Sequence, residues 1–133
     1  MSAARLAAGA RRRAALWGPV AIYMLAIFLL SSRADAPLPE GMTDKQGHSL
    51  GYLGLAVTVA RAFTGGLGAP VSVSHGLAAI AVTTAYGVSD EWHQSFVPGR
   101  TADVADLRAD ATGAIVGTAV CWLWGIIRSR STT

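Results

Sequence analysis

The amino-acid sequence predicts an all-α membrane protein in which four transmembrane helices form an antiparallel bundle. The chain has 133 residues, enough for one domain; 52% of them are hydrophobic and only 14% are charged, whereas soluble domains have a charged fraction of about 25%. Four apolar stretches lie between the charged residues, each close to the roughly 20 residues that a helix needs to cross a membrane. The domain is predicted at 14–127, between a basic tail at 1–13 and a short tail at 128–133. The predicted spans are 14–32, 45–63, 71–89 and 107–127.

The first predicted span is the stretch AALWGPVAIYMLAIFLLSS, which has no charged residue. A signal peptide is the alternative, because arginines precede this stretch and small residues follow it. The stretch is, however, longer than the roughly 7 to 15 apolar residues of a signal peptide, and three more apolar segments follow. We therefore expect a spanning helix.

The second and third predicted spans are joined by the short turn TGGLGAP. The second, KQGHSLGYLGLAVTVARAF, has Arg61 near its end, where a long basic side chain can reach the membrane interface. The third, VSVSHGLAAIAVTTAYGVS, has no formal charge. The sequence VPG then ends the helix, because the residue before Pro98 avoids the helical region and Gly99 accepts turn geometries that other residues avoid.

The fourth predicted helix begins in polar sequence and becomes apolar at Ala111. Thr101 is predicted to cap its N-terminus, with Asp103 in the first turn near the positive end of the helix dipole. Trp122 and Trp124, near its other end, are typical of the aromatic belt at a membrane interface.

The distribution of positive charge predicts that both termini are cytoplasmic. Seven of the eleven Lys and Arg residues lie in the two tails and in the turn after the second span; they are Arg5, Arg11, Arg12, Arg13, Arg61, Arg128 and Arg130. All eight acidic residues lie in or beside the two opposite connections; they are Asp35, Glu40, Asp44, Asp90, Glu91, Asp103, Asp106 and Asp110. We therefore expect an acidic outer face.

Polar residues at the start of the second span share one helical face. Asp44, His48 and Tyr52 are spaced four residues apart in DKQGHSLGY, so their side chains lie above one another on a helix. Asp44 is predicted to interact with His48, and Tyr52 is predicted to lie one turn deeper.

A second polar stripe is predicted on the fourth helix. Asp103, Asp106, Asp110, Gly113 and Gly117 recur at spacings of 3, 4, 3 and 4, which is the seam spacing of packed helices. The two glycines form a GxxxG pattern, which allows another helix to approach closely. This stripe is predicted to face the bundle, so that the aspartates line a pocket at its outer mouth.

Further polar residues lie at the end of the third helix and just after it, namely Glu91, Gln94 and Arg100. Charged groups near a bilayer cost several kcal/mol each when they are left without partners. The carboxylates of this region must therefore be paired, protonated, hydrated or neutralised by a ligand.

These two motifs resemble the VanZ-like family of small bacterial membrane proteins. DKQGHSLGYLGL fits the family's DKxxH followed by an aromatic residue, and SDEWHQSFVPGRTADVADLRADATGAIVG fits ExxQxFxPGRxxDxxDxxxNxxGxxxG. The family's polar and turn residues fall on Asp44, Lys45, His48, Glu91, Gln94, Phe96, Pro98, Gly99, Arg100, Asp103, Asp106, Gly113 and Gly117. Asp110 stands where the family usually has Asn.

The resemblance implies a four-helix protein of the bacterial cytoplasmic membrane that crosses it several times. For the founding member it also implies a contribution to resistance against the glycopeptide teicoplanin. The leading hypothesis is a non-enzymatic protein whose outer pocket binds an envelope lipid or cell-wall precursor, with Arg100 and Lys45 meeting phosphate or carboxylate. The predicted ligand-binding residues are Asp44, Lys45, His48, Tyr52, Glu91, Gln94, Arg100, Asp103, Asp106 and Asp110.

Other functions remain open at this point. The aspartates of the fourth helix could form a purely structural ion-pair network with Lys45, Arg100 and Arg108. The protein could be an enzyme acting on a lipid-linked substrate, with Glu91 or His48 as general base. A scaffold that packs against a partner through the glycine face is a third alternative.

The expected partners are membrane lipids and a cell-wall lipid intermediate or glycopeptide-related ligand, with no nucleic acid and no cofactor. A metal site is a further alternative, since hard cations suit the carboxylates and His48 with Glu91 could join them; the spacing matches no defined metal motif, so no metal ligand is assigned.

Overall fold

The computed structural model describes residues 2–35 and 38–131, and within them the chain forms four helices and no strand. Met1 of the predicted N-terminal tail, and Thr132 and Thr133 of the predicted C-terminal tail, lie outside the described residues. The helices are α1 (Ala3–Ser31), α2 (Asp44–Thr64), α3 (Val73–Gln94) and α4 (Val104–Arg130). Each predicted span coincides with one helix, although α1 begins well before the first span.

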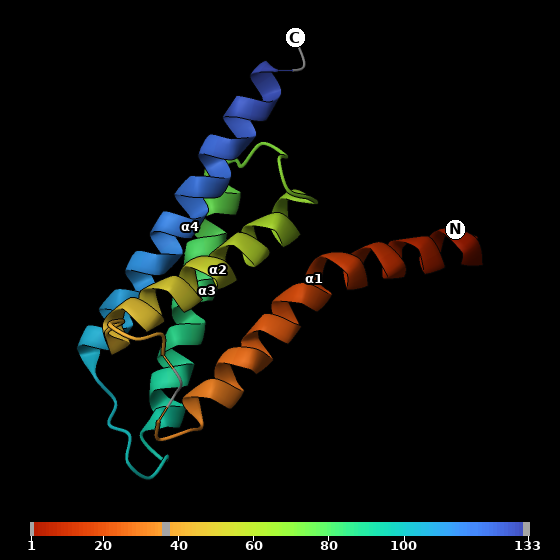
Figure 1. Ribbon diagram of the computed structural model, residues 1–133. Coiled ribbons are helices and arrows are strands. Elements are labelled where there is room, and N and C mark those ends of the chain that lie inside the picture. Colours follow the sequence, from red (N-terminus) through yellow and green to blue (C-terminus); the bar gives the residue numbers. More distant parts are fainter. Residues whose placement is uncertain (1, 36–37, 132–133) are drawn as a thin grey trace.

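Successive helices run in opposite directions (Figure 1). The α1–α2 and α3–α4 connections lie at one end, which we call the acidic end, and the α2–α3 connection lies at the other. Helices α2, α3 and α4 pack against one another, whereas α1 contacts α2 and α3 but, among the described residues, not α4. The N-terminal part of α1 extends away from the other helices. The fold is therefore a three-helix core with α1 against one side.

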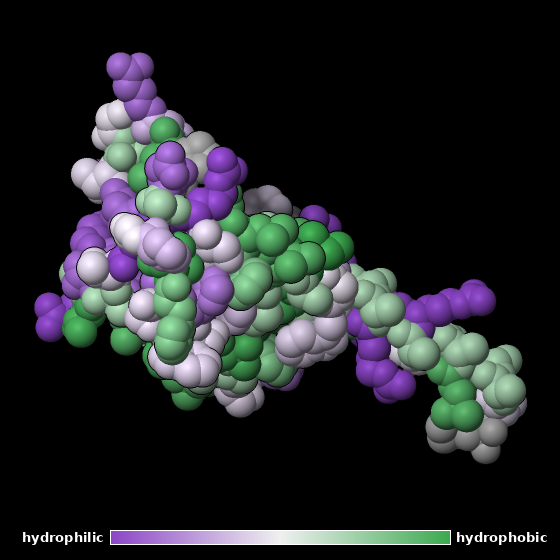
Figure 2. Space-filling view, turned by 90° about the horizontal axis from the view of Figure 1, so that it is seen from below, coloured by the Kyte–Doolittle hydropathy of each residue, from purple (hydrophilic) through white to green (hydrophobic). Residues whose placement is uncertain are grey.

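Two helices of the described chain are long and apolar enough to cross a membrane. They are Ala3–Ser31, with an 18-residue stretch of mean hydropathy 2.0, and Val104–Ser129, with one of 1.4. On α1, Ile22 and Leu25 are exposed over more than half of their surface. Figure 2 views the acidic end directly, and hydrophilic residues gather on part of it beside a hydrophobic area. Exposed apolar faces on such helices indicate a membrane protein.

Local capping explains where α2 and α4 begin. The Thr43 hydroxyl accepts the backbone N–H of Gln46, and the Gln46 side chain accepts that of Thr43, so a capping box starts α2 at the predicted place. The prediction of Thr101 as the cap of α4 is wrong. Asp103 is the N-cap, because its carboxylate accepts the N–H of Ala105 at 2.8 Å while its own backbone is extended.

Pro19 lies inside α1 and removes one of its backbone hydrogen bonds. The carbonyl that loses its donor is that of Ala15, four residues earlier. The guanidinium of Arg61 on α2 donates to this carbonyl at 3.2 Å and to that of Leu16 at 3.4 Å. Arg61 thus satisfies the acceptor that Pro19 frees, and it fastens α1 to α2.

The glycine face of α4, for which a close helix approach is predicted, lies against the backbone of α2. A Cβ atom on Gly113 would lie 2.2 Å from the carbonyl oxygen of Ser49, and one on Gly117 would lie 2.4 Å from that of Leu53. Both glycines are buried. Their face is therefore used within the chain, and the scaffold hypothesis is wrong in assigning it to a partner.

We predict that Gly117→Ala lowers the free energy of unfolding by about 1–3 kcal/mol, because α4 must move away from the α2 backbone to admit the methyl group. Thermal unfolding of the purified protein in detergent measures this change. Gly18→Ala is the matched control, since a Cβ there meets nothing within 4 Å, and it should leave the midpoint unchanged or slightly raised. Equal midpoints for the two variants would contradict the close contact.

Candidate functional site

A cavity of about 120 Å³ opens at the acidic end between α1, α2 and α3. Its lining includes the apolar side chains of Ile27 and Leu30 of α1. It also includes polar side chains, namely those of Ser31, Asp44, His48, Tyr52, Asp90, Gln94 and Arg100. The cavity therefore has an amphipathic lining.

Asp90, which the sequence motif does not single out, is central to the polar part of this lining. It is 4% exposed, and its carboxylate accepts the Ser31 hydroxyl at 2.6 Å and the Gln94 amide at 3.1 Å. Its position four residues before Gln94 on one helix was a usable signal. Nothing in the sequence indicated Ser31, which reaches Asp90 only because the end of α1 packs against α3.

Arg100 is the cationic residue of the cavity lining. Its Nη1 lies 3.6 Å from Asp44 Oδ1, and the side chain is 14% exposed. Its buried Nε has no hydrogen-bond partner in the described part of the chain. The Nε–H donor is therefore unsatisfied, while the residue as a whole lines the cavity.

Lys45 does not line the cavity, contrary to its predicted role beside Arg100. Its Nζ lies 2.7 Å from Asp103 Oδ2 and also forms an ion pair with Asp106. The Lys45 ammonium, together with the N–H of Ala105, holds the pKa of the Asp103 carboxyl below its ordinary value. This contact contributes stability above the ordinary carboxyl pKa, and the contribution is lost as the pH falls through the lowered value.

The predicted stripe on α4 is formed in part. Asp106, Asp110 and the two glycines are buried on the face toward α2, whereas Asp103 is exposed as the helix cap. Arg108 is also exposed, and no ion pair to it is found in the described chain. Of the three basic residues considered for the network, Lys45 alone pairs with aspartates of α4 in the described chain, whereas Arg100 pairs with Asp44 of α2.

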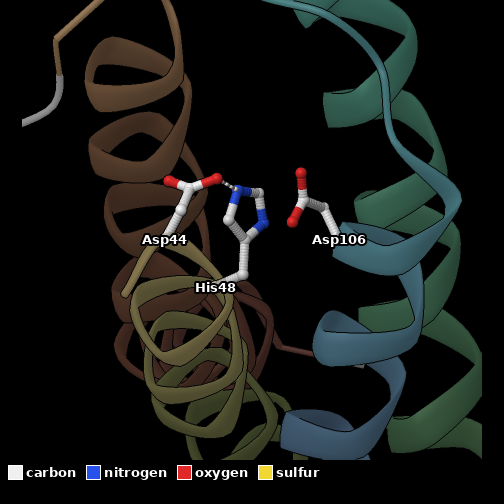
Figure 3. Close-up of side chains that lie close together, drawn as sticks. All are labelled: Asp44, His48 and Asp106. Carbon is white, nitrogen blue, oxygen red and sulfur yellow. Dashed lines mark ion pairs between the residues drawn. The ribbon is translucent and has the colours of Figure 1, made fainter. Parts of the chain in front are cut away.

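His48 lies among carboxylates from two helices. Figure 3 shows its ring between Asp44, one turn earlier on α2, and Asp106 of α4. The predicted pair with Asp44 is present, with Nε2 3.9 Å from Oδ2. A closer contact, which sequence spacing could not show, joins Nδ1 to Asp110 Oδ1 at 2.9 Å. Tyr52 stacks below His48 with the two rings 4° from parallel.

Glu91 and Asp110 lie behind this histidine and do not line the cavity. Glu91 is 7% exposed and accepts the backbone N–H of Asp103 at 2.8 Å, which links the end of α3 to the start of α4. Asp110 is fully buried. A Cβ on Gly87 of α3 would lie 2.9 Å from Asp110 Oδ2, so the missing side chain provides the space for this carboxylate.

Two overlapping sets of side chains have the composition and spacing of metal ligands. They are Asp44, His48 and Asp106, and His48, Glu91 and Asp110; within each set the ligand atoms lie within 4.8 Å of one another. Each set combines residues of different helices, so spacing along the sequence could not predict either of them.

The family model described as VanZ/LLP1 matches residues 12–125. The chain belongs to the VanZ-like family. No curated protein and no solved structure matches it. Of the VanZ-like motif, Gln94 and Arg100 line the cavity, whereas Phe96 is 69% exposed and packs edge-on against Trp92.

We predict that Lys45→Met destabilises this VanZ-like protein by about 1–3 kcal/mol, because it leaves the Asp106 carboxylate, 4% exposed, without its charged partner. The double variant Lys45→Met with Asp106→Asn should lose less than the sum of the single losses, since the two residues act as a pair. Thermal unfolding of the four proteins measures the coupling. Arg108→Met is the control, and strictly additive losses for the pair would contradict the ion pair.

Proposed function

We propose that all four helices cross the bacterial cytoplasmic membrane, with both termini on the cytoplasmic side. The alternating directions of the helices in Figure 1 support this topology, because they put both connections that contain acidic residues at one end. The arginines of the N-terminal region, of the α2–α3 turn and of the C-terminus belong to the opposite end, as the positive-inside rule requires.

This topology predicts different access to an impermeant maleimide applied to intact cells. In a Cys121→Ser background, Glu40→Cys should be labelled, whereas Arg5→Cys should be labelled only after the cells are lysed. Both positions are exposed, so burial does not interfere. Labelling of Arg5→Cys in intact cells would contradict a cytoplasmic N-terminus.

We further propose that the cavity binds a phosphate-bearing envelope lipid, either a phospholipid or a lipid-linked cell-wall intermediate. The observation behind this proposal is the amphipathic lining. A lipid headgroup requires polar partners and the first part of its chain requires an apolar surface, and the cavity lining includes both.

The charges of the lining suggest how a headgroup would be held. Arg100 lines the cavity, and a guanidinium is well suited to phosphate oxygens. Asp44 and Asp90 would oppose an anion that came close to them, but they would attract an amine on the same headgroup. Ser31 and Gln94 add neutral hydrogen-bonding groups.

We predict that Arg100→Gln reduces photo-crosslinking of a diazirine-labelled phospholipid by about tenfold, the factor expected from the loss of one charge-assisted hydrogen bond of about 1.5 kcal/mol. The purified full chain is used, and crosslinked lipid is quantified by mass spectrometry. Arg108→Gln removes an exposed arginine outside the cavity and should leave the yield unchanged. Equal losses in the two variants would mean that the lipid responds to surface charge alone.

A second arm uses a labelled lipid-linked cell-wall precursor in place of the phospholipid. Preferential capture of the precursor would identify it as the ligand, and Arg100→Gln should then also abolish any effect of the protein on teicoplanin susceptibility in cells. Conversion of the precursor into a new product would favour the enzyme hypothesis over simple binding.

A further inference from the structure

Two buried carboxylates behind the cavity have no Lys or Arg partner in the described chain, whereas three others at the acidic end do. Asp103 and Asp106 share Lys45, and Asp44 pairs with Arg100. Glu91 and Asp110, in contrast, form no ion pair with any Lys or Arg of the described chain; His48 contacts Asp110 and lies in a cluster with both. A buried negative charge without a counter-charge is costly, and one imidazole can balance at most one of the two carboxylates.

The geometry of the same residues fits a cation. His48, Glu91 and Asp110 come from α2, α3 and α4, and they offer one nitrogen and two carboxylate oxygens within 4.8 Å of one another. Helices held in fixed register by the glycine contact position these side chains, so the set is built into the core of the fold. One imidazole with two carboxylates is a donor set suited to divalent transition-metal ions.

An independent observation concerns the hydrogen bonds of Asp110. The residue is completely buried, one carboxylate oxygen contacts His48, and Oδ2 has no hydrogen-bond partner in the described chain. Buried carboxylate oxygens are almost always satisfied by a donor or a cation. One oxygen of this buried carboxylate is therefore left without a donor or a cation in the described chain.

We propose that His48, Glu91 and Asp110 bind one divalent transition-metal ion such as Zn²⁺. The imidazole and the two carboxylates are the protein ligands, which leaves coordination positions for water. The overlapping set of Asp44, His48 and Asp106 is the weaker candidate, because Arg100 and Lys45 already neutralise its two carboxylates. The site goes beyond lipid binding, since neither Glu91 nor Asp110 lines the cavity.

The proposal is tested by metal binding to the full chain in detergent. Protein stripped with a chelator is titrated with Zn²⁺ against a competing dye, and with Co²⁺, whose visible absorption reports the ligand field. The expected result is one equivalent per chain, with an affinity reduced at least about tenfold in Glu91→Gln and in Asp110→Asn. Zn²⁺ should raise the thermal midpoint of the starting protein and not those of these two variants.

Two matched variants make the result specific. Asp103→Asn removes an exposed carboxylate at the same end and keeps a residue that caps helices well, so it should retain full affinity. Asp106→Asn should also retain binding, and loss there with retention in Glu91→Gln would overturn the proposal in favour of the other set. Absence of stoichiometric binding by the folded starting protein would overturn it altogether. Lipid crosslinking of the same samples shows separately whether the cavity is intact.

Discussion

The contact between the backbones of α2 and α4 is the constraint on which the acidic end depends. Because the two helices run in the same direction, their contacts advance in step along both. Gly113 meets Ser49 and Gly117 meets Leu53. One to two turns earlier, the same register brings His48 to Asp110, and then Lys45 to Asp106. A side chain at either glycine would separate the helices and lengthen these polar contacts together.

The polar residues of the acidic end form two groups, one around the cavity and one between the core helices. Those facing α1, including Asp90 and Arg100, surround the cavity, while those between α2, α3 and α4 hold the helices in register. His48 belongs to both groups, because it lines the cavity and also contacts Asp110. A ligand that binds the buried carboxylates and moves the His48 ring would therefore also change the lining of the cavity.

Much of this arrangement could be predicted from local patterns. The length of each apolar stretch predicted the helices. The spacing of three and four residues predicted the buried stripe of α4 with its glycines, because such a spacing is a property of a single helix. The cap of α4 could not be settled in this way, since Thr101 and Asp103 are both good capping residues and the loop after Gly99 decides between them. Contacts between helices could not be predicted from local patterns either, because the Ser31–Asp90 hydrogen bond depends on how α1 packs against α3.

Gly87 of α3 makes room for side chains of two other helices. It has no catalytic or binding group, yet the space beside it is what admits a fully buried carboxylate at position 110 and the ring of Tyr52. Adding a single methyl group on α3 would require a smaller or displaced side chain on α4. Residues 87 and 110 should therefore vary together as the sequence diverges, and the coupling between them would appear as covariation between a position before the VanZ-like motif on α3 and one within it on α4.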